Sequence, residues 1–288
     1  MGLDLESSVM AQTNIKWARK INPAALTRVK GASEHFVRLN SNGIQMNIIP
    51  ANGTRSTNSP LIVEVIGLAG AGKSTFARTL CLESEQFMLG GYLNVRNPRH
   101  VPYMVRHTLL SLPTILRKPR QGRWFTLREL TKVVYLDGWN RTLKSNNSDN
   151  SATIIIDQGP IYEMATLYSF GPEELRNPRY NLWWGNLFER WAQTIDMVIW
   201  LVAPMEILIE RIRSREKWHP VKESSVREMR KYLTRYQSAY EHVMSELLAN
   251  HEISVLQLST GSNTVEDIMT QALNAIFSHQ DETLQKGS

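Results

Sequence analysis

The sequence is poor in the features that mark secreted and membrane proteins. It contains one cysteine, Cys81, so no internal disulfide can form. No stretch approaches the roughly 18 to 20 consecutive apolar residues of a membrane-spanning helix, and the N-terminus lacks the basic-then-apolar order of a secretory signal. No His and Cys residues occur at zinc-ligand spacing. We therefore expect a soluble, cytoplasmic protein with no transmembrane segment.

Length and composition indicate a globular protein. The chain has 288 residues, of which 42% are hydrophobic and 21% charged, close to ordinary soluble domains. Residues 1–59 carry no usable motif and end in a turn-rich run, so we interpret them as an N-terminal extension and linker. One large domain is expected over residues 60–279, with a basic helical insertion at 84–150 cut into short helices by prolines, and a tail at 280–288.

Acidic residues are scarce in one long segment. Between Arg96 and Lys144 there are eleven Lys or Arg residues against two acids, Glu129 and Asp137. A phosphorylated substrate, a membrane surface or a nucleic acid could each neutralise such a segment, and a solvated basic face explains it equally well.

Apolar runs alternate with helical patterns in the remainder of the domain. Short β-branched runs are typical of strands covered on both faces, and such runs between helices indicate a doubly wound parallel sheet. We expect an α/β fold with a sheet of about five strands flanked by helices. The strand candidates are 61–66, 153–157, 197–202 and 253–258, and the helical patterns are 75–81, 206–215, 223–249 and 264–277.

The first strand leads into a glycine-rich loop that fits G-x-x-x-x-G-K-[ST], the Walker A pattern of a P-loop. Glycines let the backbone wrap around phosphate oxygens, while N–H groups and the helix N-terminus supply positive potential. Lys73 would reach the β- and γ-phosphates, and Ser74 would ligate Mg²⁺. The predicted binding residues for ATP in this loop are Gly67, Ala69, Gly70, Ala71, Gly72, Lys73, Ser74 and Thr75.

Two further charged features could act beside this loop. Asp157 ends an apolar strand, where a carboxylate could hold Mg²⁺ or accept a proton, or instead cap the next helix. Arg211 and Arg215 are four residues apart, so they share a helix face and could close on phosphates together. Considered alone, this arginine pair is more typical of a solvated helix.

The P-loop, Asp157 and the Arg211-x-x-x-Arg215-x-Lys217 stretch together resemble thymidylate kinase and the deoxynucleoside kinases. The resemblance implies a lid at about 211–222 that closes over ATP, with Arg211, Arg215 and Lys217 contacting the nucleotide. It also implies that the loop at 259–262, which includes Thr260, borders the adenine. The expected activity is transfer of the γ-phosphate of ATP·Mg²⁺, with Lys73, Asp157, Arg211 and Arg215 as catalytic residues.

Two departures from that family concern the acceptor. Gln158 stands where the family usually has Arg, and no acid occurs between Glu85 and Glu129 to serve as a base. An anionic or phosphorylated acceptor, such as a nucleoside monophosphate or a nucleoside-like molecule, needs cations more than a base. We predict that such a small-molecule acceptor is held by Arg96, Arg99 and Arg141. Otherwise Asp157 acts as base toward a hydroxyl.

The main alternative is a nucleotide-dependent switch or ATPase whose basic segment binds a partner, a membrane or a nucleic acid. The sequence lacks the Asn-Lys-x-Asp guanine motif and has no Glu directly after Asp157 to polarise a hydrolytic water. We therefore favour the kinase, expect no nucleic-acid partner, and leave homodimer formation open. The aromatic residues Tyr180, Trp183, Trp184 and Trp191 could stack on a planar acceptor, although core packing is the favoured interpretation.

Overall fold

A computed structural model describes most of the expected domain. The described residues are 46–47, 60–90, 102–103, 105–109, 123–145, 152–249 and 251–286. Within these ranges, no helix is long and apolar enough to cross a membrane. The predicted N-terminal extension lies outside the described residues, apart from Met46 and Asn47.

The domain is built on a six-stranded sheet with the order β1-β6-β5-β2-β4-β3. Strands β2 to β6 are parallel to one another, and β1 pairs antiparallel with β6 at one edge. This arrangement confirms the predicted α/β class with five parallel strands. The strand bounds are β1 (Met46–Asn47), β2 (Leu61–Gly67), β3 (Phe87–Leu89), β4 (Thr153–Asp157), β5 (Met197–Val202) and β6 (Ser254–Ser259).

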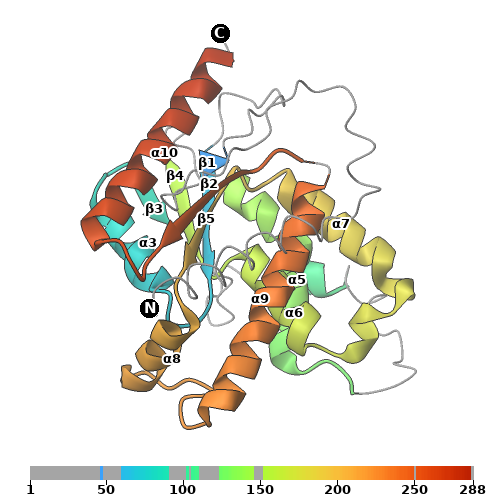
Figure 1. Ribbon diagram of the computed structural model, residues 1–288. Coiled ribbons are helices and arrows are strands. Elements are labelled where there is room, and N and C mark those ends of the chain that lie inside the picture. Colours follow the sequence, from blue (N-terminus) through green and yellow to red (C-terminus); the bar gives the residue numbers. More distant parts are fainter. Residues whose placement is uncertain are drawn as a thin grey trace. The chain divides into compact units, whose positions relative to one another are not determined.

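Helices cover both faces of the sheet (Figure 1). One face packs against α5, α6 and α7, and the other against α3, α8 and α10. The N-terminal part of α9 joins the second core and its C-terminal part the first, so α9 links the two layers. The helix bounds are α3 (Lys73–Leu82), α5 (Leu127–Ser145), α6 (Pro160–Phe170), α7 (Asn181–Ala192), α8 (Met205–Ser214), α9 (Val226–Leu248) and α10 (Val265–Lys286). Short 3₁₀ turns, η2 (Glu173–Arg176) and η3 (Pro178–Tyr180), precede α7.

The central position of β2 explains its composition. Every residue of β2 is buried, because β4 and β5 pair with it on either side and helices cover both faces. Parallel strands end at the same edge, so β2 and β4 deliver Gly67 and Asp157 to neighbouring positions there. The order of the sheet thus places the predicted phosphate loop beside the predicted acid.

The structure corrects several expected boundaries. The predicted insertion at 84–150 contains a strand of the sheet, β3, and its described part carries one 19-residue helix, α5, rather than only short ones. The prolines stand upstream of α5, so they do not interrupt it. Two residues of the predicted extension form β1, and α10 continues to Lys286 through the predicted tail.

Two of the three tryptophans of α7 are core residues, as favoured, and Trp183 is partly buried against the same cluster. Trp184 and Trp191 are buried, and their indole N–H groups donate to the carbonyls of Leu175 and Leu136, at 2.8 and 2.9 Å. Tyr180 is buried in the same cluster.

Candidate active site

Three glycines shape the loop between β2 and α3. Gly67, Gly70 and Gly72 have φ values of 147°, 88° and 86°, in the region that side chains rarely adopt. A Cβ on Gly67 would lie 2.4 Å from the carbonyl oxygen of Leu201, and one on Gly70 would lie 2.8 Å from that of Leu208. The first two glycines therefore let the loop pack directly against β5 and α8. Gly72 is exposed at the N-cap of α3, where the helix N–H groups begin.

Lys73 is the first residue of α3 and is buried, with 8% of its surface exposed. Its Nζ donates a hydrogen bond to the carbonyl oxygen of Leu68 at 3.0 Å, so the side chain folds back along the loop. Burial lowers the pKa of Lys73 to about 8; nearby Asp157 opposes this shift and Arg215 adds to it. The loop thus holds a cationic side chain whose positive charge is only partly balanced by Asp157. A phosphate anion could balance the rest of this charge.

Asp157 is the last residue of β4 and lies opposite Val65 of β2. Its Oδ1 is buried and has no hydrogen-bond partner among the described residues. The capping interpretation is wrong, because the first-turn N–H groups of α6 donate to Glu64 instead. A buried, unpartnered carboxylate oxygen beside a lysine fits the ligand set of Mg²⁺, to which Ser74 in the first turn of α3 would add its hydroxyl.

The three predicted lid residues differ from one another in their surroundings. Arg211, in the last turn of α8, donates to the Gly70 carbonyl at 3.3 Å and to the Thr260 carbonyl and hydroxyl at 2.8 and 3.1 Å. It therefore ties the phosphate loop to the loop after β6, where the adenine was expected. Arg215 follows the end of α8 and lies close enough to shift the pKa of Lys73, while Lys217 is exposed in the next turn.

His219 was not expected at the site. Burial lowers its pKa, and the positive charges of Arg215 and Lys73 lower it further. Its ring stands edge-on to Tyr232 of α9, with centroids 5.7 Å apart. A lone histidine flanked by Trp218 and Pro220 gave no sequence signal for this proximity, which depends on the turn between α8 and α9.

The predicted acceptor residues lie where side chains are not described. Arg96 and Arg99 are outside the described residues, and Arg141 lies on α5 with its side chain undescribed. Two other cations of the basic segment have internal partners: Arg123 forms a two-armed ion pair with Glu129 at 2.6 and 2.8 Å, and Lys132 pairs with Glu163 of α6. These two basic residues therefore serve helix packing.

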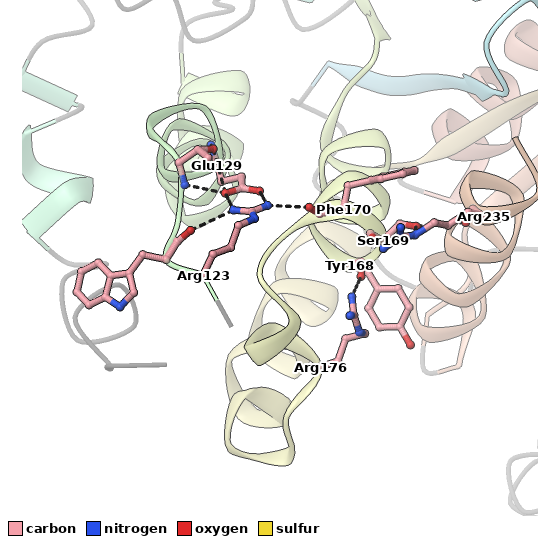
Figure 2. A network of polar contacts seen from close by, with 9 residues as sticks. Arg123, Glu129, Tyr168, Ser169, Phe170, Arg176 and Arg235 are labelled. Atoms are coloured by element: carbon pink, nitrogen blue, oxygen red, sulfur yellow. Dashed lines mark hydrogen bonds and ion pairs between the residues drawn. The ribbon is translucent and has the colours of Figure 1, made fainter. Parts of the chain in front are cut away.

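Three arginines hold the C-terminal end of α6: Arg176 of η2, Arg235 of α9 and Arg123 of the segment before α5 (Figure 2). Arg176 donates to the Tyr168 carbonyl at 2.9 Å, Arg235 to that of Ser169, and Arg123 to that of Phe170 at 3.0 Å. The last carbonyls of a helix have no partner within it and carry partial negative charge, so three guanidinium groups stabilise this end. The helix that starts just after Asp157 is thereby anchored at its far end.

Comparison with solved structures finds kinases at low identity. Deoxyadenosine kinase from M. mycoides with bound dATP is 16% identical, with a TM-score of 0.43, over 75% of this chain and 99% of that chain. Thymidylate kinase from Candida albicans is 14% identical, with a TM-score of 0.45, over 78% and 94%. Shikimate kinase from Bacteroides thetaiotaomicron is 10% identical, with a TM-score of 0.42, over 75% and 98%. No protein-family model and no curated protein matches the chain.

Proposed function

We propose that the chain is an ATP-dependent phosphotransferase that moves the γ-phosphate of ATP to a small, anionic acceptor. The observation that carries this proposal is the grouping of Lys73, Asp157 and Arg215 at the end of the phosphate loop, close enough for their charges to shift the pKa of the lysine. The two cations there could neutralise the negative charge of a triphosphate, and the carboxylate could hold the divalent metal bound to it.

Each residue has a separate role in the proposed reaction. The N–H groups of the loop and of the first turn of α3 bind phosphate oxygens, and Lys73 neutralises charge on the β- and γ-phosphates. Ser74 and Asp157 would hold Mg²⁺, which supplies charge neutralisation when bound. Phosphoryl transfer depends mainly on positioning and electrostatic stabilisation, so this set covers much of the required chemistry.

The lid is proposed to be shorter than the sequence indicated. Arg211 is fixed by Gly70 and Thr260, so it belongs to the wall of the nucleotide site. Arg215 and Lys217 lie beyond the end of α8, in the turns before α9. We propose that these turns close over bound phosphates while α8 stays in place.

The proposed anionic acceptor rests on the basic segment and on Gln158. Arg123 and Lys132 of this segment have internal partners, and the proposed acceptor residues are Arg96, Arg99 and Arg141, as the sequence predicts. Replacing Arg96 and Arg99 together with Glu is expected to raise the acceptor KM by roughly tenfold or more at unchanged ATP KM. An unchanged acceptor KM would contradict the role of these arginines and leave the kinase activity standing.

The activity itself can be tested by measuring ADP release from ATP and Mg²⁺ in the presence of nucleosides, nucleotides, sugars and sugar phosphates. The proposal predicts that one acceptor class stimulates ADP release strongly. Constant release regardless of acceptor would instead indicate a hydrolase.

Two variants show whether the described loop is responsible. Lys73→Ala should lose the stimulated release, whereas Arg78→Ala, which removes an exposed cation from the same helix, should retain it. A fully active Lys73→Ala variant with an unaltered circular dichroism spectrum would refute the assignment.

A further inference from the structure

The central strand of the sheet carries one acid among apolar residues. Glu64 of β2 is fully buried, with 0% of its surface exposed, between Ile62 and Ile66 on the face that packs against α6. Placing a carboxyl group in such an environment costs free energy unless donors satisfy it. Burial raises the pKa of Glu64 to about 8, although backbone N–H groups of α6 oppose the shift.

Those donors come from the first turn of α6, 97 residues away in the sequence. The Ile161 N–H lies 3.0 Å from both carboxyl oxygens of Glu64, and the Tyr162 N–H lies 3.2 Å from Oε1. The N-cap residue Gly159 has no side chain to cap the helix, and Pro160 has no N–H. Glu64 thus fills the position that a capping side chain or a bound anion would otherwise occupy.

The turn that Glu64 contacts directly follows Asp157. Gln158 has φ = 58°, a left-handed conformation that is rare for a residue with a side chain. Gly159 packs so closely that a Cβ would lie 2.5 Å from Cγ2 of Ile156 and 2.9 Å from Cδ of Glu64. A backbone held in this conformation persists only where its surroundings fix it. The β4 ladder fixes one side of the turn, and Glu64 contacts the other.

From this arrangement we infer that Glu64 is a positioning residue: by holding the Gln158–Gly159 turn and the start of α6, it sets the direction of the Asp157 carboxylate. Asp157 needs such support, because its buried Oδ1 has no hydrogen-bond partner among the described residues. The inference rests on the proposed function, in which Asp157 holds Mg²⁺. Substituting a residue that orients a metal ligand commonly changes the metal affinity by about tenfold or more.

The test compares ATP affinity with and without Mg²⁺, by titration calorimetry on the full chain. Metal-free ATP reports on the loop and Lys73, whereas the ratio of the two dissociation constants reports on the metal site. Glu64→Leu should reduce the Mg²⁺ effect by roughly tenfold and change metal-free affinity by less than about twofold. Glu64→Gln, whose amide oxygen still accepts from Ile161, should keep most of the effect.

The matched control is Arg176→Leu, which removes a donor from the other end of the same helix. It should lower the melting temperature of the protein and leave the Mg²⁺ effect unchanged. Amide hydrogen exchange supplies a second readout, since Ile161 and Tyr162 should exchange faster in Glu64→Leu and at the wild-type rate in Arg176→Leu. If Glu64→Leu does not fold, Gly159→Ala perturbs the same contact from the opposite side and should lose the Mg²⁺ effect.

The outcomes separate the inference from the function on which it rests. A folded Glu64→Leu or Gly159→Ala protein with the wild-type Mg²⁺ effect would overturn the inference alone. An equal loss in Glu64→Gln and Glu64→Leu would show that the hydrogen bond accepted from Ile161 does not support the metal site, and would overturn positioning. A wild-type protein with no Mg²⁺ effect would contradict the magnesium site, and the inference with it.

Discussion

Lys73 shows how burial that disfavours a charge in the free protein can increase the affinity for a ligand of opposite charge. Its ammonium group is removed from water and donates to the Leu68 carbonyl, which also accepts from the Ala71 N–H at 3.1 Å. The carbonyl is therefore satisfied without the lysine. A bound phosphate would draw Nζ away at little cost and stabilise its charge, so we expect ATP binding to raise the pKa of Lys73.

Affinity for ATP should consequently depend on pH. Because the pKa of Lys73 in the free protein is lowered to about 8 and the charged form binds phosphate, affinity is retained below pH 8 and lost above it. The loss should approach about tenfold per pH unit. Calorimetry from pH 7 to 9.5 measures this slope, with Glu64→Gln as the control that removes the other described group with a pKa near 8. A flat profile up to pH 9.5 would contradict the role of Lys73.

At the scale of elements, α6 is held at both ends by residues distant in sequence. Glu64 accepts from the first turn, and Arg123, Arg176 and Arg235 donate to the last (Figure 2). The arginines have the charge sign that the helix dipole favours at a C-terminal end, and Glu64 supplies hydrogen-bond acceptors to the N-terminal end. The helix therefore acts as a fixed support between the Asp157 turn and the helices α5 and α9.

Removing Arg123 should destabilise the fold through Glu129. The Arg123 side chain is 51% exposed but that of Glu129 only 11%, so Arg123→Ala leaves a mostly buried carboxylate without its cation. We expect a loss of about 1 to 2 kcal/mol in the free energy of unfolding. In a Glu129→Gln background the same substitution should cost less, and a urea-unfolding cycle of the four proteins measures the difference. Additive costs would show that the pair contributes no coupling.

Sequence patterns predicted some elements well because the signal was local. β2, β4 and β5 are short β-branched runs whose burial on both faces can be read from their own composition. β3 has three residues, of which only Phe87 is buried, so it carries no such signal. The uninterrupted α5 was missed because the prolines of the surrounding segment were taken to break the whole of it.

At the scale of the whole molecule, the candidate active site depends on the order of the strands in the sheet. Because β2 lies between β4 and β5, the phosphate loop receives Asp157 from one neighbour and packs against Leu201 of the other. The motif predicted the loop, and the strand pattern predicted the edge at which Asp157 stands. The Glu64 contact, the anchoring of Arg211 and the position of His219 could not be predicted, because each joins segments that are far apart in the sequence.

Ligand binding should stabilise the protein as a whole. ATP with Mg²⁺ at a hundred times its dissociation constant is expected to add about 2.7 kcal/mol to the free energy of unfolding. For a domain of this size, the melting temperature should rise by roughly 5 to 10 °C. Differential scanning fluorimetry measures the shift, which should be absent in Lys73→Ala and retained in Arg78→Ala. An equal shift in Lys73→Ala would place ATP elsewhere.

The fate of the terminal phosphate tests the central claim most directly. The protein is incubated with ATP labelled in the γ-phosphate, Mg²⁺ and the acceptor that stimulates ADP release, and the labelled products are separated. We predict that the label appears in the acceptor in equal amount to the ADP formed, and that Lys73→Ala forms no labelled acceptor. Label found only in inorganic phosphate would contradict phosphotransfer and identify the protein as a hydrolase.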